Sequence, residues 1–208
     1  MTAGAHLPVQ AVLVAALAGA AAIVLAGCGG SVSKRPEAGI PSSLLAQARP
    51  IGKGAAFHPV AKGPVIGSCT AALGARQGAH VEVFAANRVV LLASGIGTLP
   101  PRTLFAGRIT HARCYGTLVT LDPTGLVLTR PGRTLYVSDL FRSWGQPLSR
   151  HQIASFHAPP DTEVAVFVDG RRWRGSPGGV PLDRHAEIVL EVGPHVPPHL
   201  SYRFPPGT

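Results

Sequence analysis

Past the amino-terminal quarter of the chain, apolar residues recur in short runs, and these runs are separated by residues typical of turns. Runs rich in β-branched and aromatic side chains, several of them alternating with polar residues, are typical of strands. No long amphipathic helix pattern accompanies them, so the sequence predicts a mostly β domain, a compact sandwich or barrel-like fold with one or two short helices. The predicted strands fall at residues 81–85, 88–92, 105–112, 117–121, 126–128, 134–137, 163–173 and 186–192.

Three tight turns are predicted to join neighbouring strands into hairpins. Asp169-Gly170 lies between two β-rich runs and favours a type I′ turn. Residues 122–125 read Asp-Pro-Thr-Gly, which fits a type I or type II turn, and Ala86-Asn87 separates a third pair of runs.

One short helix is predicted after residue 137, and a second over residues 149–156. In the first, Ser138 can cap the amino-terminal end, and Leu140, Phe141 and Trp144 share one face at helical spacing. Gly145 follows and is expected to end the helix.

The amino terminus predicts export and a lipid anchor. Residues 11–25 form an apolar run with the length of a signal-peptide core, short for a membrane span. It ends in Leu25-Ala26-Gly27-Cys28, which resembles the bacterial lipobox. That resemblance implies cleavage before Cys28 and acylation of its thiol. Residues 1–8 contain no Lys or Arg, unlike a usual signal peptide, and a plain amino-terminal membrane helix is the alternative.

These features divide the chain into three parts. Residues 1–27 are predicted to be a lipoprotein signal peptide, and residues 28–63 the lipidated cysteine with a flexible tether rich in Pro and Gly. Residues 64–208 are predicted to form a β-rich extracytoplasmic domain. The expected location is the outer face of the cytoplasmic membrane, with the lipid anchor as the contact to the bilayer.

If Cys28 carries lipid, Cys69 and Cys114 remain as a pair. Because disulfides persist in oxidising compartments, we expect these two cysteines to be bonded to each other. Two buried thiols are the alternative. Neither cysteine has a second ligand at the spacing of a zinc site.

The chain carries a formal net charge of +9. A basic exported protein can meet an acidic envelope polymer or a protein partner, although a merely solvated basic surface is the simpler interpretation. No nucleic-acid-binding motif is present, so nucleic acid is not an expected partner.

Two His-x-Glu pairs are the best candidates for chemistry. Residues i and i+2 of a strand share a face, so His80 with Glu82, and His185 with Glu187, can each present an imidazole beside a carboxylate. His111 precedes Cys114 and completes the candidate ligand-binding set. Such groups bind zinc or copper or transfer protons, but they also occur hydrogen-bonded to backbone at strand ends.

No catalytic or cofactor-binding motif appears in the chain: there is no G-x-S-x-G elbow, no P-loop and no dinucleotide fingerprint. No cofactor is therefore expected. The sequence favours a binding or structural module at the cell envelope over an enzyme. The alternative is a metal-binding domain or metal-dependent enzyme that uses the His and Glu residues named above.

The chain also resembles an uncharacterised family of secreted or lipid-anchored mostly β domains of actinobacteria and archaea. In that family a His-Thr-His-Asp segment and a later His imply a metal site. Here the corresponding residues are Val119, Thr120, Leu121 and Asp122, and then Leu128, so the resemblance implies a member that lacks those three histidines. The stretches that carry it are residues 78–84, 95–97, 114–115, 121–125, 140–145 and 166–170.

Overall fold

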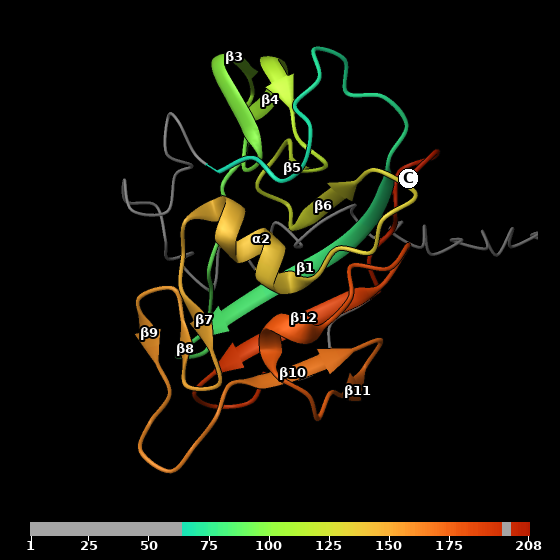
Figure 1. Ribbon diagram of the computed structural model, residues 1–208. Coiled ribbons are helices and arrows are strands. Elements are labelled where there is room, and N and C mark those ends of the chain that lie inside the picture. Colours follow the sequence, from blue (N-terminus) through green and yellow to red (C-terminus); the bar gives the residue numbers. More distant parts are fainter. Residues whose placement is uncertain (1–63, 197–200) are drawn as a thin grey trace, which may run out of the picture. The chain divides into compact units, whose positions relative to one another are not determined.

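A sheet of seven strands organises the part of the chain that this computed structural model describes, residues 64–196 and 201–208 (Figure 1). The predicted signal peptide, Cys28 and the tether lie outside the described residues. The order across the sheet is β11 (Arg171–Arg172), β10 (Ala165–Val168), β12 (Glu187–Val192), β1 (Gln77–Ala85), β6 (Leu126–Thr129) and β5 (Leu118–Thr120), with β2 (Arg88–Val89) also paired to β1.

Strands β1 and β12 lie side by side at the centre of this sheet and run parallel, although they are about 100 residues apart in the chain. The other pairings of the sheet are antiparallel. The register of the central pair sets His80 opposite Glu187 and Glu82 opposite Val189. Two segments from opposite ends of the domain therefore place their polar side chains next to one another.

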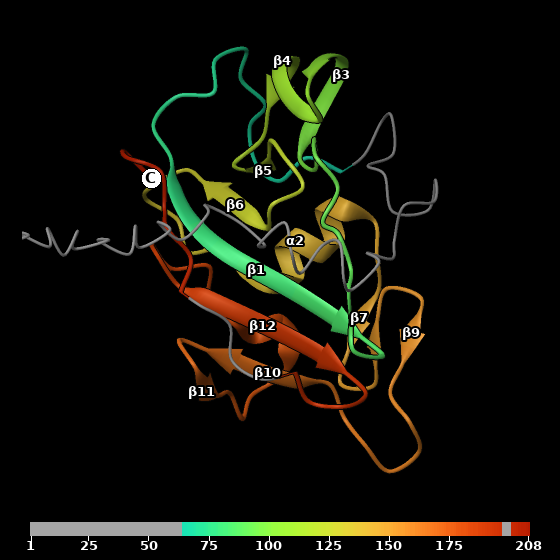
Figure 2. The same cartoon turned by 180° about the vertical axis from the view of Figure 1, so that it is seen from behind.

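The main apolar core lies against one face of the sheet, where helix α2 (Val137–Trp144) packs (Figure 1, Figure 2). Because side chains alternate along a strand, Val81 and Val83 of β1 point into this core together with Phe141 and Trp144 of the helix. Those four side chains are at most 1% exposed. The helix is held on the sheet by this apolar contact.

Two smaller sheets complete the domain. Strands β3 (Thr98–Phe105) and β4 (Arg108–Tyr115) form a hairpin that projects beyond the main sheet (Figure 1). Strands β7 (Leu148–Ser149), β8 (Gln152–Ile153) and β9 (Phe156–His157) form a short meander. A 3₁₀ turn, η2 (Pro177–Gly179), precedes β12.

The expected disulfide between Cys69 and Cys114 is present, with the two Cα atoms 5.3 Å apart. Cys114 belongs to β4, so the bond ties the segment before β1 to the projecting hairpin. The chain closed by this bond spans 45 residues, and a loop of that length contributes roughly 4 kcal/mol to stability through the unfolded state.

The mostly β class with a short helix is confirmed, and so are the three predicted hairpins. The helix begins two residues earlier than expected: Tyr136 rather than Ser138 is its N-cap, and the Asp139 carboxylate accepts the backbone N–H of Tyr136 at 2.9 Å. The helix ends at Gly145 as predicted. Among the described residues, no helix has the length and apolar character needed to cross a membrane.

Three local predictions were wrong. Residues 149–156 form the meander of β7 to β9 rather than a second helix, because Ala154 turns the chain with a positive φ of 49°. Residues 134–137 supply a single bridge, from Tyr136 to Pro181, and not a strand. The run at 105–112 spans a turn: Ala106 and Gly107 both have positive φ and join β3 to β4, a junction without an Asn-Gly or Asp-Gly signal.

Candidate functional site

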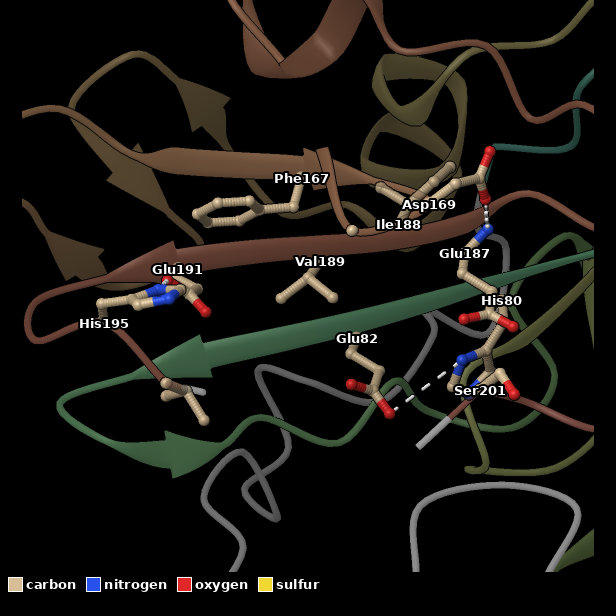
Figure 3. Close-up of a pocket in the computed structure, with 12 residues that line it drawn as sticks. His80, Glu82, Phe167, Asp169, Glu187, Ile188, Val189, Glu191, His195 and Ser201 are labelled. Atoms are coloured by element: carbon tan, nitrogen blue, oxygen red, sulfur yellow. Dashed lines mark hydrogen bonds and ion pairs between the residues drawn. The ribbon is translucent and has the colours of Figure 1, made fainter. Parts of the chain in front are cut away.

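A cleft of about 370 Å³ opens on the face of the sheet that points away from the main core. Strand alternation produces it: the residues of β1 and β12 between those that enter the core point to the opposite side. Figure 3 shows these side chains, which come from β1, β12 and the end of β10. Its polar lining consists mainly of His80, Glu82, Asp169, Glu187, Glu191 and His195.

The cleft concentrates negative charge on a positively charged protein. The chain contains ten Asp and Glu residues in all, and four of them line this one cleft. The chain as a whole carries a formal net charge of +9. A local anionic site on a basic protein is a distribution that selects for positively charged ligands.

Glu82 is the most perturbed acid of the cleft, with 5% of its side chain exposed. Burial disfavours its charged form, and the neighbouring Glu187 carboxylate adds repulsion, so the pKa of Glu82 is raised to about 7. Burial also raises the pKa of Glu187, although the Tyr202 backbone N–H, which donates to its Oε1 at 2.9 Å, opposes that effect. Both carboxylates therefore keep their protons to higher pH than an exposed Glu does.

The imidazole of His80 lies beside Glu82 in a fixed orientation. Its Nε2 is 2.9 Å from the carbonyl oxygen of Thr124, and because a carbonyl only accepts, Nε2 carries the proton. The other ring nitrogen, Nδ1, is 4.0 Å from Glu82 Oε1. The ring stacks on Tyr202 with 3.9 Å between centroids. The neighbouring Ser201 lines the cleft, so the carboxyl-terminal segment contributes to its wall.

The turn at residues 122–125 supports this arrangement from behind. The backbone oxygen of Gly125 accepts the N–H of Val81 at 2.9 Å. Gly125 has a φ of +85°, and a Cβ there would lie 2.6 Å from the oxygen of Val81 and 2.9 Å from His80 Nε2. The glycine is thus required both by the turn and by the close approach of the histidine ring.

At the other end of β12, Glu191 is 2% exposed and accepts a hydrogen bond from His195 Nδ1 at 2.7 Å. The His195 ring also lies 5.1 Å from the ring of Phe167. Val189 lies between this pair and the Glu82–Glu187 end of the cleft (Figure 3). The cleft is therefore acidic at both ends and apolar in its middle.

The structure brings together three of the five predicted ligand-binding residues: His80, Glu82 and Glu187. His185 lies before β12 begins, has a φ of +64°, and contacts the backbone oxygen of Thr208 through Nε2 at 2.6 Å. His111 is exposed on β4, in the separate hairpin. Neither of these two lines the cleft.

Sequence reasoning missed Asp169, Glu191 and His195. A signal existed for Glu191, because it lies four residues after Glu187 on one strand and so shares its face. Asp169 was assigned to a turn, and its Oδ1 does accept the N–H of Glu187 at 2.9 Å. His195 lies among prolines and carried no strand or helix pattern.

The positions at which the resembled family carries histidines are apolar and buried here. Val119, Leu121 and Leu128 are at most 6% exposed and pack in a second hydrophobic cluster. Asp122 forms an ion pair with Arg108. Within residues 64–196 and 201–208, no three His, Cys, Asp or Glu side chains are grouped so that they could hold a metal ion.

Comparison with known proteins adds no assignment to this geometry. No family model, no curated protein and no solved structure matches the chain. The family resemblance drawn from the sequence therefore stays a prediction, and the function is inferred from the side chains of the cleft.

Proposed function

We propose that the protein is a membrane-anchored extracytoplasmic binding module whose cleft binds an organic cation, with a linear di- or polyamine as the preferred class. The observation that carries the proposal is the gathering of Glu82, Asp169, Glu187 and Glu191 around one cleft in a protein of net charge +9. An ammonium group stabilises buried carboxylates that otherwise repel one another.

The length of the cleft favours a ligand with two charges. Glu187 and Glu191 are four residues apart on β12, and a strand rises about 3.3 Å per residue, so their backbones are about 13 Å apart. Val189 and Phe167 lie between them and suit a methylene chain. One ammonium group would sit against Glu82 and Glu187, and the other would approach Glu191 in competition with His195.

The anchor and location are supported by the amino-terminal sequence. Leu25-Ala26-Gly27-Cys28 directly follows an apolar run, and an acylated Cys28 with two chains would hold the protein stably on a membrane. The disulfide between Cys69 and Cys114 supports an oxidising location outside the cytoplasm. A binding module at that position would collect its ligand next to the membrane.

Calorimetric titration of the intact chain with putrescine at pH 8 tests the cleft. We expect saturable binding of one putrescine, with affinity reduced at least tenfold by Glu82→Gln and by Glu187→Gln. Glu163→Gln is the matched control, because Glu163 is about half exposed in an ion pair with Arg150, outside the cleft. The neutral analogue 1,4-butanediol should not bind.

The same protein titrated with zinc and copper tests the alternative of a metal site. Stoichiometric metal that resists dialysis and is lost in His80→Ala, without putrescine binding, would replace the organic cation with a metal as the ligand. Absence of binding for both classes of cation would overturn the assignment of the cleft.

The anchor is tested by Cys28→Ala in the producing cell. We expect loss of acyl labelling and of signal cleavage, with the chain no longer recovered as a lipidated product. Unchanged labelling and processing of this variant would contradict the lipid anchor and leave the cleft proposal standing.

A further inference from the structure

The tip of the β3–β4 hairpin exposes two large apolar side chains. Leu104 is 56% exposed and Phe105 is 77% exposed, and both immediately precede the two-residue turn of Ala106 and Gly107. The hairpin projects beyond the main sheet, away from strands β10 and β11 (Figure 1). These two side chains do not contribute to core packing and are free to contact a surface outside the domain.

The exposure does not come from a loosely held loop. Ile109, which pairs with Leu104 across the hairpin, is 3% exposed and packs in the second hydrophobic cluster. Its backbone N–H also donates to the carbonyl oxygen of Leu121 at 2.7 Å. The hairpin is thus fixed to the body of the domain directly below the tip, and the two apolar side chains are held out into solvent.

The hairpin that carries these apolar residues is basic. The hairpin, residues 98–115, contains three arginines and no Asp or Glu. Arg108 adjoins the turn and forms an ion pair with Asp122 while half of its side chain stays exposed. Arg113 is exposed farther along β4. The hairpin therefore combines an apolar tip with basic residues along its strands.

We propose that this hairpin tip docks on an anionic lipid bilayer, with Leu104 and Phe105 in the interfacial layer and the arginines at the headgroups. Apolar side chains flanked by basic ones bind such surfaces through buried apolar area together with attraction to anionic lipid. The inference uses the membrane anchoring in the proposed function, which keeps the domain near a bilayer. It is independent of what the cleft binds.

A bilayer fits this feature better than a protein partner does. A stable protein interface buries roughly 800 Å² on each side and involves about twenty residues or more. The apolar surface at the tip is limited to two side chains at a two-residue turn. A lipid interface needs no complementary pocket. Two apolar side chains can insert into it when nearby basic residues bind the anionic headgroups.

Depth-dependent fluorescence quenching in reconstituted vesicles tests the docking. The intact chain carrying Phe105→Trp is reconstituted into phosphatidylcholine vesicles with brominated acyl chains, with or without phosphatidylglycerol. We expect the added Trp emission, after subtraction of the parent chain, to be quenched at least twofold in anionic vesicles. In vesicles of phosphatidylcholine alone, and in Arg113→Gln, the quenching should fall by at least half.

Ser155→Trp is the matched control, because Ser155 is exposed in the turn between β8 and β9, in a separate sheet. This position should stay unquenched, even though the amino-terminal segment holds every chain on the vesicle. Equal quenching at both positions, or none at position 105, would overturn the docking. A blue shift at position 105 without any quenching by the brominated chains would indicate a protein contact and would also overturn it.

The outcome is separable from the proposed function. Quenching at position 105 in the Cys28→Ala chain would keep the docking while the lipid anchor fails. Loss of putrescine binding in Glu82→Gln, with quenching at position 105 unchanged, would show that the cleft and the tip act separately.

Discussion

The two faces of strand β1 are equally buried but chemically opposite. Val81 and Val83 point into the main core, where their neighbours are apolar side chains of the sheet and of α2. His80 and Glu82 point to the other face and are 4% and 5% exposed, as closed to water as many core residues. The same strand thus serves a packed core on one side and a cleft with titratable groups on the other.

This contrast shows that burial alone does not identify a stabilising contact. Burying an apolar side chain stabilises the fold by about 25 cal/mol per Å². Burying a carboxylate costs free energy unless a partner compensates its charge or a proton neutralises it. The raised pKa of Glu82 reflects that cost, and carboxylates with raised pKa values cluster at functional sites.

The largest expected effect on stability comes from truncating side chains of β12, and it should differ between the core face and the cleft face of the sheet. Leu190 is 0% exposed in the main core, and Val189 is part-exposed in the cleft. We expect Leu190→Ala to lower the free energy of unfolding by about 2–5 kcal/mol, and Val189→Ala to lower it by about 1 kcal/mol. Urea denaturation followed by circular dichroism measures both. Equal losses would remove the distinction between the faces.

Much of this sheet could be predicted from local patterns. Asp169-Gly170 and Ala86-Asn87 placed two hairpins correctly because turn chemistry acts within a few residues. The parallel pairing of β1 with β12 could not be predicted, because no local signal specifies which distant strands become neighbours. That pairing is what sets His80 opposite Glu187 and so creates the cleft.

The second-largest expected effect is the change in the free energy of unfolding with pH. Below the ordinary Glu pKa of 4.5, Glu82 is protonated in both the folded and the unfolded chain. Between that value and its folded pKa of about 7, only the folded chain keeps the proton. The stabilisation is thus fully present below pH 4.5 and is lost as the pH rises through 7, a change of about 3 kcal/mol.

In Glu82→Gln the side chain at position 82 is neutral at every pH. The free energy of unfolding of this variant should therefore exceed that of the parent chain by up to about 3 kcal/mol at pH 8. The difference should vanish near pH 4.5. Denaturation curves at pH 4.5, 6 and 8 measure it, with Glu163→Gln as an exposed control. A pH profile identical to the parent's would mean that Glu82 ionises normally.

The candidate site was only partly accessible from sequence. The spacing of His80 and Glu82 correctly gave a shared strand face, because alternation is a property of the strand itself. The same rule failed for His185, since β12 begins at Glu187 and the histidine lies in the preceding turn with a positive φ. His195 follows the end of β12 in an irregular segment, so no strand or helix periodicity could predict its hydrogen bond to Glu191.

Ligand affinity should follow the ionisation of Glu82. With a pKa of about 7, its carboxylate is mostly charged at pH 8 and mostly protonated at pH 6. Putrescine affinity should therefore be about tenfold lower at pH 6, a change of about 1.4 kcal/mol, with proton release on binding. Titration in two buffers of different ionisation enthalpy measures both quantities. In Glu82→Gln the residual affinity should lose most of this pH dependence.

The smallest expected effect concerns the wall that the carboxyl-terminal segment adds to the cleft face. The Tyr202 ring stacks on His80 and also packs in the second hydrophobic cluster. Tyr202→Phe keeps the ring, whereas Tyr202→Leu keeps an apolar side chain but removes the stacking, which contributes about 0.5–1.5 kcal/mol. We therefore expect Tyr202→Leu to unfold at lower urea than Tyr202→Phe by that amount, and to bind putrescine more weakly because His80 loses its orientation. Equal stability and equal affinity of the two variants would show that the stacking of Tyr202 does not orient His80, and that Tyr202 contributes only its apolar bulk.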